Sequence, residues 1–235
     1  HKQFNISNRK ICVVYYGFEN VYGTKPTPNK KFTVGFIGRF EAIKGVHVLV
    51  EAAKYFPSDL VHFKIAGDGP LKDFLVKSAS GVENISWVGR VAEPMNFISG
   101  LDVLVVPSIR EPLGIVAIEA GLCGVPVIAT NIDGLPEVVK SNCGYLLQPT
   151  EVLNQKVFSY TKTAVPTAVV DPVSHELVYP KEICSKDLVS AIYEIKANPK
   201  AALKRSENLK KHVVNTFTRR NYYNSVNSVY REFIF

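Results

Sequence analysis

The chain has 235 residues, a hydrophobic content of 46% and a formal net charge of +7, which indicate a folded globule and exclude a disordered chain. Its four cysteines show no CxxC spacing, so we expect neither a zinc site nor a disulfide framework, as in a reducing compartment. No apolar window is long enough to span a bilayer and no signal peptide is present, so we expect a cytoplasmic protein.

Short β-rich runs alternate with helical patterns between residues 32 and 147. The expected strands are 32–37, 61–66, 84–88, 102–106 and 126–130, and the expected helices are 46–55, 71–79, 95–99 and 115–122. This alternation predicts right-handed βαβ units, and hence an α/β fold with a Rossmann-like, doubly wound parallel sheet and helices on both faces. Ligands of such sheets bind outside the carboxyl ends of the strands, so the turns after the strands are the candidate sites.

The turn after the first strand carries two cations. Residues 38–45 read Gly-Arg-Phe-Glu-Ala-Ile-Lys-Gly. Glycine lets the backbone approach a ligand closely, and Arg39 and Lys44 can supply the fixed positive charge that a diphosphate requires. A solvated basic loop has the same pattern, so the turn gains weight only together with the next segment.

The segment 111–119 holds two carboxylates eight residues apart around the start of an expected helix. Such a helix aims free backbone N–H groups and the positive end of its dipole at a ligand. We expect Glu111 at the mouth of the helix and Glu119 roughly 12 Å further along its axis. Two polar targets on either side of a phosphate site match a nucleotide-sugar. Since Glu111 would repel the phosphate, we expect the cations of the first turn to lie nearby.

Three further turns follow expected strands. In the Gly-Asp-Gly-Pro turn, ligand contact by Asp68 competes with plain turn chemistry, in which Pro70 begins the next helix. Arg90 and Val91 follow the third strand and are candidates for contact with a base. Gly134 is expected to adopt a positive φ at the rim of the site.

Motifs for metals and cofactors are missing from the sequence. The five histidines are scattered, and there is no Walker loop, no GxSxG elbow and no dinucleotide-binding GxGxxG. We therefore expect neither a metal nor a cofactor, and we interpret His47 as an ordinary helix residue.

Positive charge gathers at the two ends of the chain. Residues 1–31 carry a net charge of +5 and residues 196–235 one of +7, whereas the middle carries −5. Basic ends fit a solvated helix face, an anionic membrane surface at the cytoplasmic side or an acidic partner. We expect no nucleic-acid partner, because aromatic residues are not interleaved with the basic ones.

These residues resemble the carboxyl-terminal, nucleotide-sugar-binding domain of the family 4 retaining glycosyltransferases, which is one half of their GT-B fold. Six motifs occur in the family's order: residues 16–19, residues 38–45, residues 67–70, residues 88–91, the Glu111–Glu119 pair and residues 134–137. The resemblance implies a hexosyltransferase that moves a sugar, with retention, from a UDP- or GDP-sugar to a glycan or lipid-linked acceptor. Such enzymes serve polysaccharide or lipopolysaccharide biosynthesis.

The resemblance also implies residue roles. Arg39 and Lys44 would hold the donor diphosphate and stabilise the leaving group, and Glu111 would contact the sugar hydroxyls, so these three are the expected catalytic residues. Glu119 would accept hydrogen bonds from the ribose hydroxyls. The other expected donor-binding positions are Gly38, Arg90, Val91, Gly114, Ile115 and Val116. No metal is implied, because the cations are built into the protein.

We expect four segments in this chain. These are the end of an interdomain connection with an entry strand (1–31), a nucleotide-sugar-binding core (32–150), an atypical insertion (151–185) and carboxyl-terminal helices (186–235). The insertion is about thirty residues longer than usual connections of the family. Its residues 167–170 and 176–179 are hairpin-like. The resemblance departs at Leu113, where the family usually has Phe, and at Asp133, where a paired glycine is more usual.

The chain opens on His1, so we expect a preceding acceptor-binding domain and expect this chain to bind a donor without transferring its sugar. In this fold the last helix often returns to that domain, so several of its aromatic residues are expected either to be exposed or to fold back. These are Tyr222, Tyr223, Tyr230, Phe233 and Phe235. Two alternatives stay open: a nucleotide-sugar-binding module without catalysis, and a GT-B epimerase or hydrolase of nucleotide-sugars.

Overall fold

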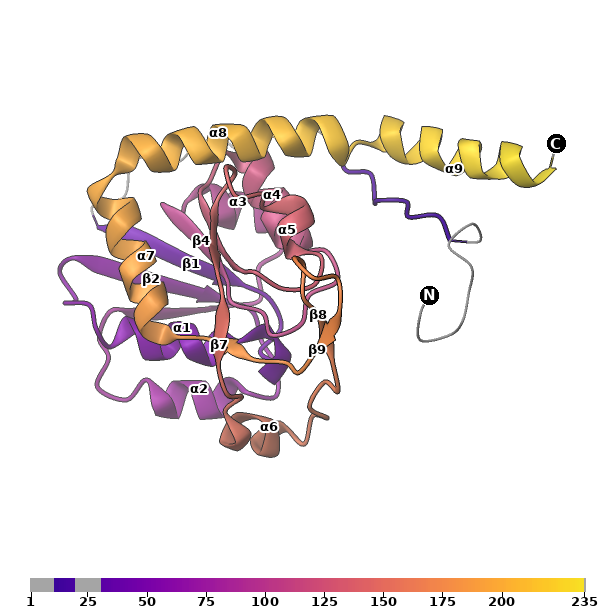
Figure 1. Cartoon of the computed structure of the whole chain (residues 1–235). Coiled ribbons are helices and arrows are strands. Elements are labelled where there is room, and N and C mark those ends of the chain that lie inside the picture. The colour runs from indigo at the N-terminus through magenta and orange to yellow at the C-terminus, as the bar shows by residue number, and fades with distance from the viewer. Residues whose placement is uncertain (1–10, 20–30, 235) are drawn as a thin grey trace.

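A computed structural model describes residues 11–19 and 31–234 (Figure 1). Its core is a six-stranded parallel sheet in the order β3-β2-β1-β4-β5-β6. The strands are β1 Phe32–Ile37, β2 Val61–Ala66, β3 Ile85–Gly89, β4 Val103–Val106, β5 Val127–Thr130 and β6 Tyr145–Leu147. The connecting helices are η3 Ala42–Lys44, α1 Val46–Ala53, α2 Lys72–Ser78, α3 Pro94–Ser99, α4 Ile115–Cys123 and α5 Leu135–Val138. This strand order confirms the Rossmann-like, doubly wound sheet, whose order reverses between β1 and β4.

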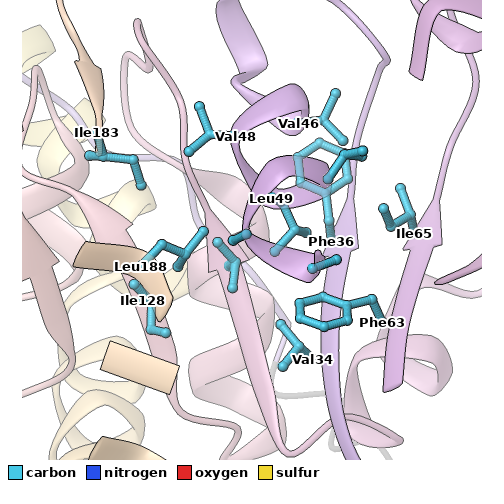
Figure 2. Close-up of a cluster of buried hydrophobic side chains, with 14 of the residues drawn as sticks. Val34, Phe36, Val46, Val48, Leu49, Phe63, Ile65, Ile128, Ile183 and Leu188 are labelled. Atoms are coloured by element: carbon cyan, nitrogen blue, oxygen red, sulfur yellow. The ribbon is translucent and has the colours of Figure 1, made fainter. Parts of the chain in front are cut away.

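The sheet is buried on both faces by two separate hydrophobic clusters. Successive residues of β4 alternate between them: Val103 and Val105 face one cluster, and Leu104 and Val106 the other. Figure 2 shows part of the first cluster, in which Leu49 of α1 packs beside strand side chains. Each such buried side chain contributes about 1.5–3 kcal/mol to folding. The near-continuous apolar strands of the sequence follow from this two-sided burial.

The segment 151–185, expected as an insertion, folds onto the domain. It follows from the end of β7 Pro149–Glu151 and contains α6 Gln155–Thr161, β8 Val169–Val170, β9 Leu177–Val178 and β10 Glu182–Ile183. The antiparallel pairing of β8 with β9 confirms the expected hairpin. Helix α6 was not expected from the sequence. It begins at Asn154, whose side chain accepts a hydrogen bond from the backbone N–H of Lys156 at 3.2 Å.

His47 ties the insertion to helix α1. Its Nε2 lies 2.8 Å from Glu182 Oε2, and only 8% of its side chain is exposed. His47 lies within α1, as expected of a helix residue, but the sequence did not predict its burial or its pairing with β10, the strand with which the insertion returns to the core. The alternative in which Pro70 begins a helix is wrong, because Leu71 is the N-cap of α2.

Three helices complete the chain: α7 Ser185–Ala197, α8 Pro199–Thr216 and α9 Arg219–Ile234. Leu209 and Val213 of α8 close the second cluster, whereas α9 projects away from the sheet (Figure 1). Tyr222, Tyr223 and Tyr230 are exposed along it, which is one of the two arrangements expected. In the described part of the chain, no helix combines the length and apolar character that crossing a membrane requires.

Candidate functional site

A pocket of about 180 Å³ opens at the carboxyl ends of β1 and β4, where the strand order reverses. Its lining residues are Phe36, Ile37, Gly38, Lys44, Val105, Val106, Ser108, Glu111, Ile115 and Val116. Two hollows of about 580 and 490 Å³ lie instead beside α1 and the insertion, and beside α7. We place the candidate site at the smaller pocket, because doubly wound sheets bind ligands at this reversal point. Its volume suits one portion of a ligand, since whole-ligand pockets measure roughly 300–1,000 Å³.

Lys44 and Glu111 form the charged centre of the pocket. Lys44 Nζ lies 2.6 Å from Glu111 Oε2, with 27% and 12% of the two side chains exposed. Ser108 Oγ also donates to Glu111 Oε2, at 3.3 Å. A cation thus neutralises the carboxylate at the helix mouth, as the sequence argument required. Because solvent is largely excluded, the pair is stronger than a surface ion pair and more sensitive to the loss of one partner.

Close packing of two loops brings this pair together. Lys44 ends the short helix η3, and the next residue, Gly45, has a φ of 65°. A Cβ at Gly45 would lie 1.9 Å from the carbonyl oxygen of Pro107, in the loop that follows β4. Ile109 N–H also donates to the carbonyl of Ile43 at 2.8 Å. Only glycine allows this approach and this backbone conformation, so the turn after β1 carries Lys44 to Glu111.

Helix α4 presents an open N-terminus to the pocket. Its N-cap is Gly114, which has no side chain to cap the helix. The first bond inside the helix runs from Ala117 N–H to Gly114 O at 2.9 Å. The N–H groups of Ile115 and Val116, which line the pocket, therefore have no acceptor within the helix. Together with the helix dipole, N–H groups in this arrangement can bind an anionic oxygen such as that of a phosphate.

Glu119 lies one helical turn beyond Ile115, on the same helix. Among the described residues, no hydrogen bond or ion pair holds its carboxylate, and partial burial raises its pKa above the ordinary value. The expected separation between Glu119 and Glu111 assumed that all eight residue steps between them advance at the helical rise, and this assumption was wrong. Helix α4 begins at Ile115, so residues 111–114 do not advance along the axis at the helical rise.

Three other expected site residues lie outside this pocket. Arg39 is 75% exposed and pairs with Glu41 at 2.7 Å. Arg90 is 86% exposed, with its Nε 3.7 Å from Asp68 Oδ2. Val91 follows β3 and is half-buried. Both arginines project from turns at the carboxyl edge, so their side chains can reorient toward a ligand without refolding.

The turn after β5 departs from expectation. Gly134 has a φ of −87°, so the predicted positive φ was wrong, and Asp133 adopts it instead with a φ of 47°. Glycine is required at 134 for a different reason: a Cβ there would lie 1.9 Å from the carbonyl oxygen of Pro112. Sequence reasoning missed Asp133, although Asp immediately before Gly in a turn is a recognised signal for a left-handed residue.

The described residues contain no group of three or more His, Cys, Asp or Glu side chains that could hold a metal ion. The four cysteines are free. The charged side chains that line the pocket are those of Lys44 and Glu111, beside the N-terminus of α4.

Comparison with known sequences links the chain to enzymes. The family model described as "Glycosyl transferases group 1" matches residues 22–163. The Staphylococcus aureus capsular polysaccharide biosynthesis glycosyltransferase CapM is 31% identical over 156 residues, which cover 63% of this chain and 38% of that protein. The chain spans less than half the length of curated relatives such as this one.

Solved structures share the architecture. Anabaena Alr3699/HepE, crystallised in complex with UDP and glucose, aligns with a TM-score of 0.77 at 21% identity, over 98% of this chain and 59% of that one. The C-terminal domain of LpcC from Francisella tularensis, a glycosyl transferase group 1 family protein, aligns with a TM-score of 0.58 at 22% identity, over 88% of this chain and 97% of that one. At these identities the likeness is one of fold.

Proposed function

Because this chain belongs to the glycosyl transferases group 1 family, we propose that it is the donor-binding, carboxyl-terminal domain of a retaining glycosyltransferase. It binds a nucleotide-diphosphate-sugar, and the acceptor is a glycan or a lipid-linked glycan. The likeness to the separate C-terminal domain of LpcC supports the carboxyl-terminal position. The capsule-related relative supports a role in polysaccharide or lipopolysaccharide biosynthesis.

The observation that carries this proposal is the Lys44–Glu111 pair beside the open N-terminus of α4. A site for a simple anion gains nothing from a carboxylate, which would repel the ligand. A nucleotide-sugar explains both charges, since the diphosphate takes the cation and the helix N–H groups while the sugar hydroxyls donate to Glu111. Glu119, further along the same helix, is free to accept hydrogen bonds from the ribose.

In the proposed reaction, the bond between the anomeric carbon and the diphosphate oxygen breaks and the oxygen of an acceptor hydroxyl takes its place on the same face. The proton of that hydroxyl passes to the departing diphosphate. Negative charge develops on the departing diphosphate while the sugar becomes oxocarbenium-like. Lys44 and the N–H groups of α4 would stabilise that charge from their present positions, and Arg39 would turn from Glu41 toward the diphosphate to join them. The proposal assigns the neutralisation to these groups and includes no metal.

The donor is a UDP- or GDP-sugar, and the Anabaena complex with UDP and glucose favours uridine. The base would lie against Arg90 and Val91. A preceding domain would contribute the acceptor contacts, so this chain alone binds the donor without turnover. The basic carboxyl-terminal helices would rest against an anionic membrane surface.

Calorimetric titration tests the proposal. The chain is titrated at low salt with UDP, GDP, ADP and their sugar conjugates, and one base is expected to bind selectively. Glu119→Ala should weaken the bare nucleotide and its sugar conjugate alike, whereas Glu111→Ala should weaken only the sugar conjugate. If Glu111→Ala weakens the bare nucleotide as much as its sugar conjugate, the assigned roles are contradicted. Measurable transfer by the chain alone would contradict its dependence on another domain.

A further inference from the structure

Asp133, in the turn after β5, joins two segments that are far apart in the sequence. Its Oδ2 accepts a hydrogen bond from Glu111 N–H at 3.0 Å, and its Oδ1 accepts one from Val170 N–H at 2.7 Å. The first partner lies in the loop that forms the candidate site. The second lies in strand β8 of the insertion.

Backbone groups reinforce both contacts. Asp133 N–H donates to the carbonyl of Val170 at 3.0 Å, and Gly134 N–H donates to the carbonyl of Glu111 at 3.2 Å. The backbone of Glu111 and the backbone of Val170 are thus each held at both their N–H and C=O groups by the turn at 133–134. A carboxylate that accepts two N–H groups is a strong contact, because each bond is charge-assisted.

The backbone of Asp133 adopts an unfavourable conformation that its hydrogen bonds stabilise. Its φ of 47° lies in the left-handed region, which costs a residue with a side chain free energy that surrounding contacts must offset. Four hydrogen bonds converge on the turn and supply that offset. The conformation in turn aims the carboxylate between Glu111 and Val170.

The hairpin behind Asp133 is itself fixed. Val169 is 2% exposed and belongs to the cluster that covers one face of the sheet. The hairpin loop is closed by Asp171 Oδ1, which accepts from the N–H groups of Val173 and Ser174 at 2.9 and 2.7 Å. Val170 N–H is therefore presented from an anchored support.

We propose that Asp133 is a positioning residue for Glu111 and that the β8–β9 hairpin braces it, so that the insertion controls recognition of the sugar portion of the donor. This inference rests on the proposed function, since it takes Glu111 as the contact to the sugar. Asp133 and the hairpin bond from Val170, together called the brace, hold the Glu111 backbone. Lys44 and Ser108 hold one oxygen of the Glu111 side chain. Losing the brace should leave the phosphate site intact and misplace the carboxylate.

Two variants remove the brace from opposite sides. Asp133→Gly removes both acceptor oxygens and tolerates the left-handed backbone, so its effect is not one of strain. Val170→Pro removes the N–H donor without touching Asp133. The matched controls are Val170→Ala, which shortens the side chain and keeps the N–H, and Glu176→Gln, which removes an exposed charge from the same hairpin.

The first measurement is calorimetric titration of the whole chain with UDP and with UDP-glucose. Asp133→Gly and Val170→Pro should each weaken UDP-glucose binding about tenfold. This is the effect of losing about one charge-assisted hydrogen bond between Glu111 and the sugar. UDP binding should change less than about twofold, and the controls should match the wild type. Unchanged UDP-glucose binding in both variants, or equal losses for the two ligands, would overturn the inference.

The second measurement needs no ligand. Amide hydrogen exchange of Glu111 should accelerate in both brace variants and not in the controls, and unchanged exchange would overturn the inference by itself. Comparing each brace variant with the single variant Glu111→Ala separates the two proposals. If Glu111→Ala alone leaves UDP-glucose binding unaltered, the proposed function fails. If it weakens binding while the brace variants do not, only the inference fails.

Discussion

Replacing Lys44 by methionine removes the cation of the pocket and keeps most of its hydrocarbon chain. In the ligand-free protein the change strands Glu111, whose carboxylate lies 2.6 Å from the Lys44 ammonium. Breaking a fully buried pair costs about 3–5 kcal/mol and breaking an exposed one at most about 1 kcal/mol. For a pair that retains some solvent, we expect a loss of about 1–2 kcal/mol in the free energy of unfolding.

The same change removes a charge-assisted contact to the diphosphate. Such a contact is worth about 1.5–3 kcal/mol, so UDP binding should weaken by about 10- to 150-fold. Calorimetry at low and high salt measures the affinity, and urea unfolding measures the stability. The salt dependence of UDP binding should also fall, because one charge of the site is gone.

Lys54→Met is the matched control, because Lys54 makes an ion pair of the same length, 2.6 Å, with Glu51 on the exposed face of α1. It should change stability by less than about 1 kcal/mol and leave UDP binding alone. The double variant Lys44→Met with Glu111→Gln should recover stability and not UDP affinity. UDP binding by Lys44→Met at wild-type strength would refute the assignment of Lys44 to the phosphate.

Three further changes probe single features. Glu119→Gln should raise the free energy of unfolding at pH 7. Burial lifts the pKa of Glu119 above its ordinary value of 4.5, so the folded state binds the proton more tightly than the unfolded state does. At pH 7 the charged carboxylate therefore lowers stability, and glutamine removes that cost. The gain should vanish below pH 4.5, as urea unfolding across pH would detect. His47→Ala removes the imidazole partner of the largely buried Glu182 carboxylate and leaves it only the longer contact with Asn154 N–H at 3.4 Å, so it should cost about 2 kcal/mol by urea unfolding. Gly45→Ala adds a left-handed alanine and a clash with the Pro107 carbonyl, so it should cost about 2 kcal/mol or more.

Each of these changes has a control in the same chain. Glu83→Gln removes an exposed charge and should give no pH-dependent gain. His62→Ala removes a half-exposed histidine, paired with Ser86 at 3.0 Å, and should cost clearly less than His47→Ala. Gly81 also has a positive φ, 80°, but no atom lies within 4 Å of a Cβ placed there. If Gly81→Ala lowers the free energy of unfolding as much as Gly45→Ala does, the close approach of the two loops is not the reason that position 45 requires glycine.

Local chemistry determined much of this fold. The first strand and the second were predicted at their observed bounds, 32–37 and 61–66, because each run is rich in β-branched and aromatic residues and a glycine follows its end. The parallel order followed from the alternation of strand and helix. Lys44 and Glu111 could be paired in advance, since both follow strands that must end at one edge.

Only the tertiary structure decided which distant residues support the site. Asp133 meets Glu111 across 22 positions and Val170 across 37, and His47 meets Glu182 across 135. No periodicity or turn rule encodes such contacts, because they depend on where an irregular insertion settles. The sequence by itself therefore determined the sheet and the charges at its edge. The tertiary structure decided that Asp133 and Gly134 hold the Glu111 backbone and that Val170 of the insertion holds Asp133.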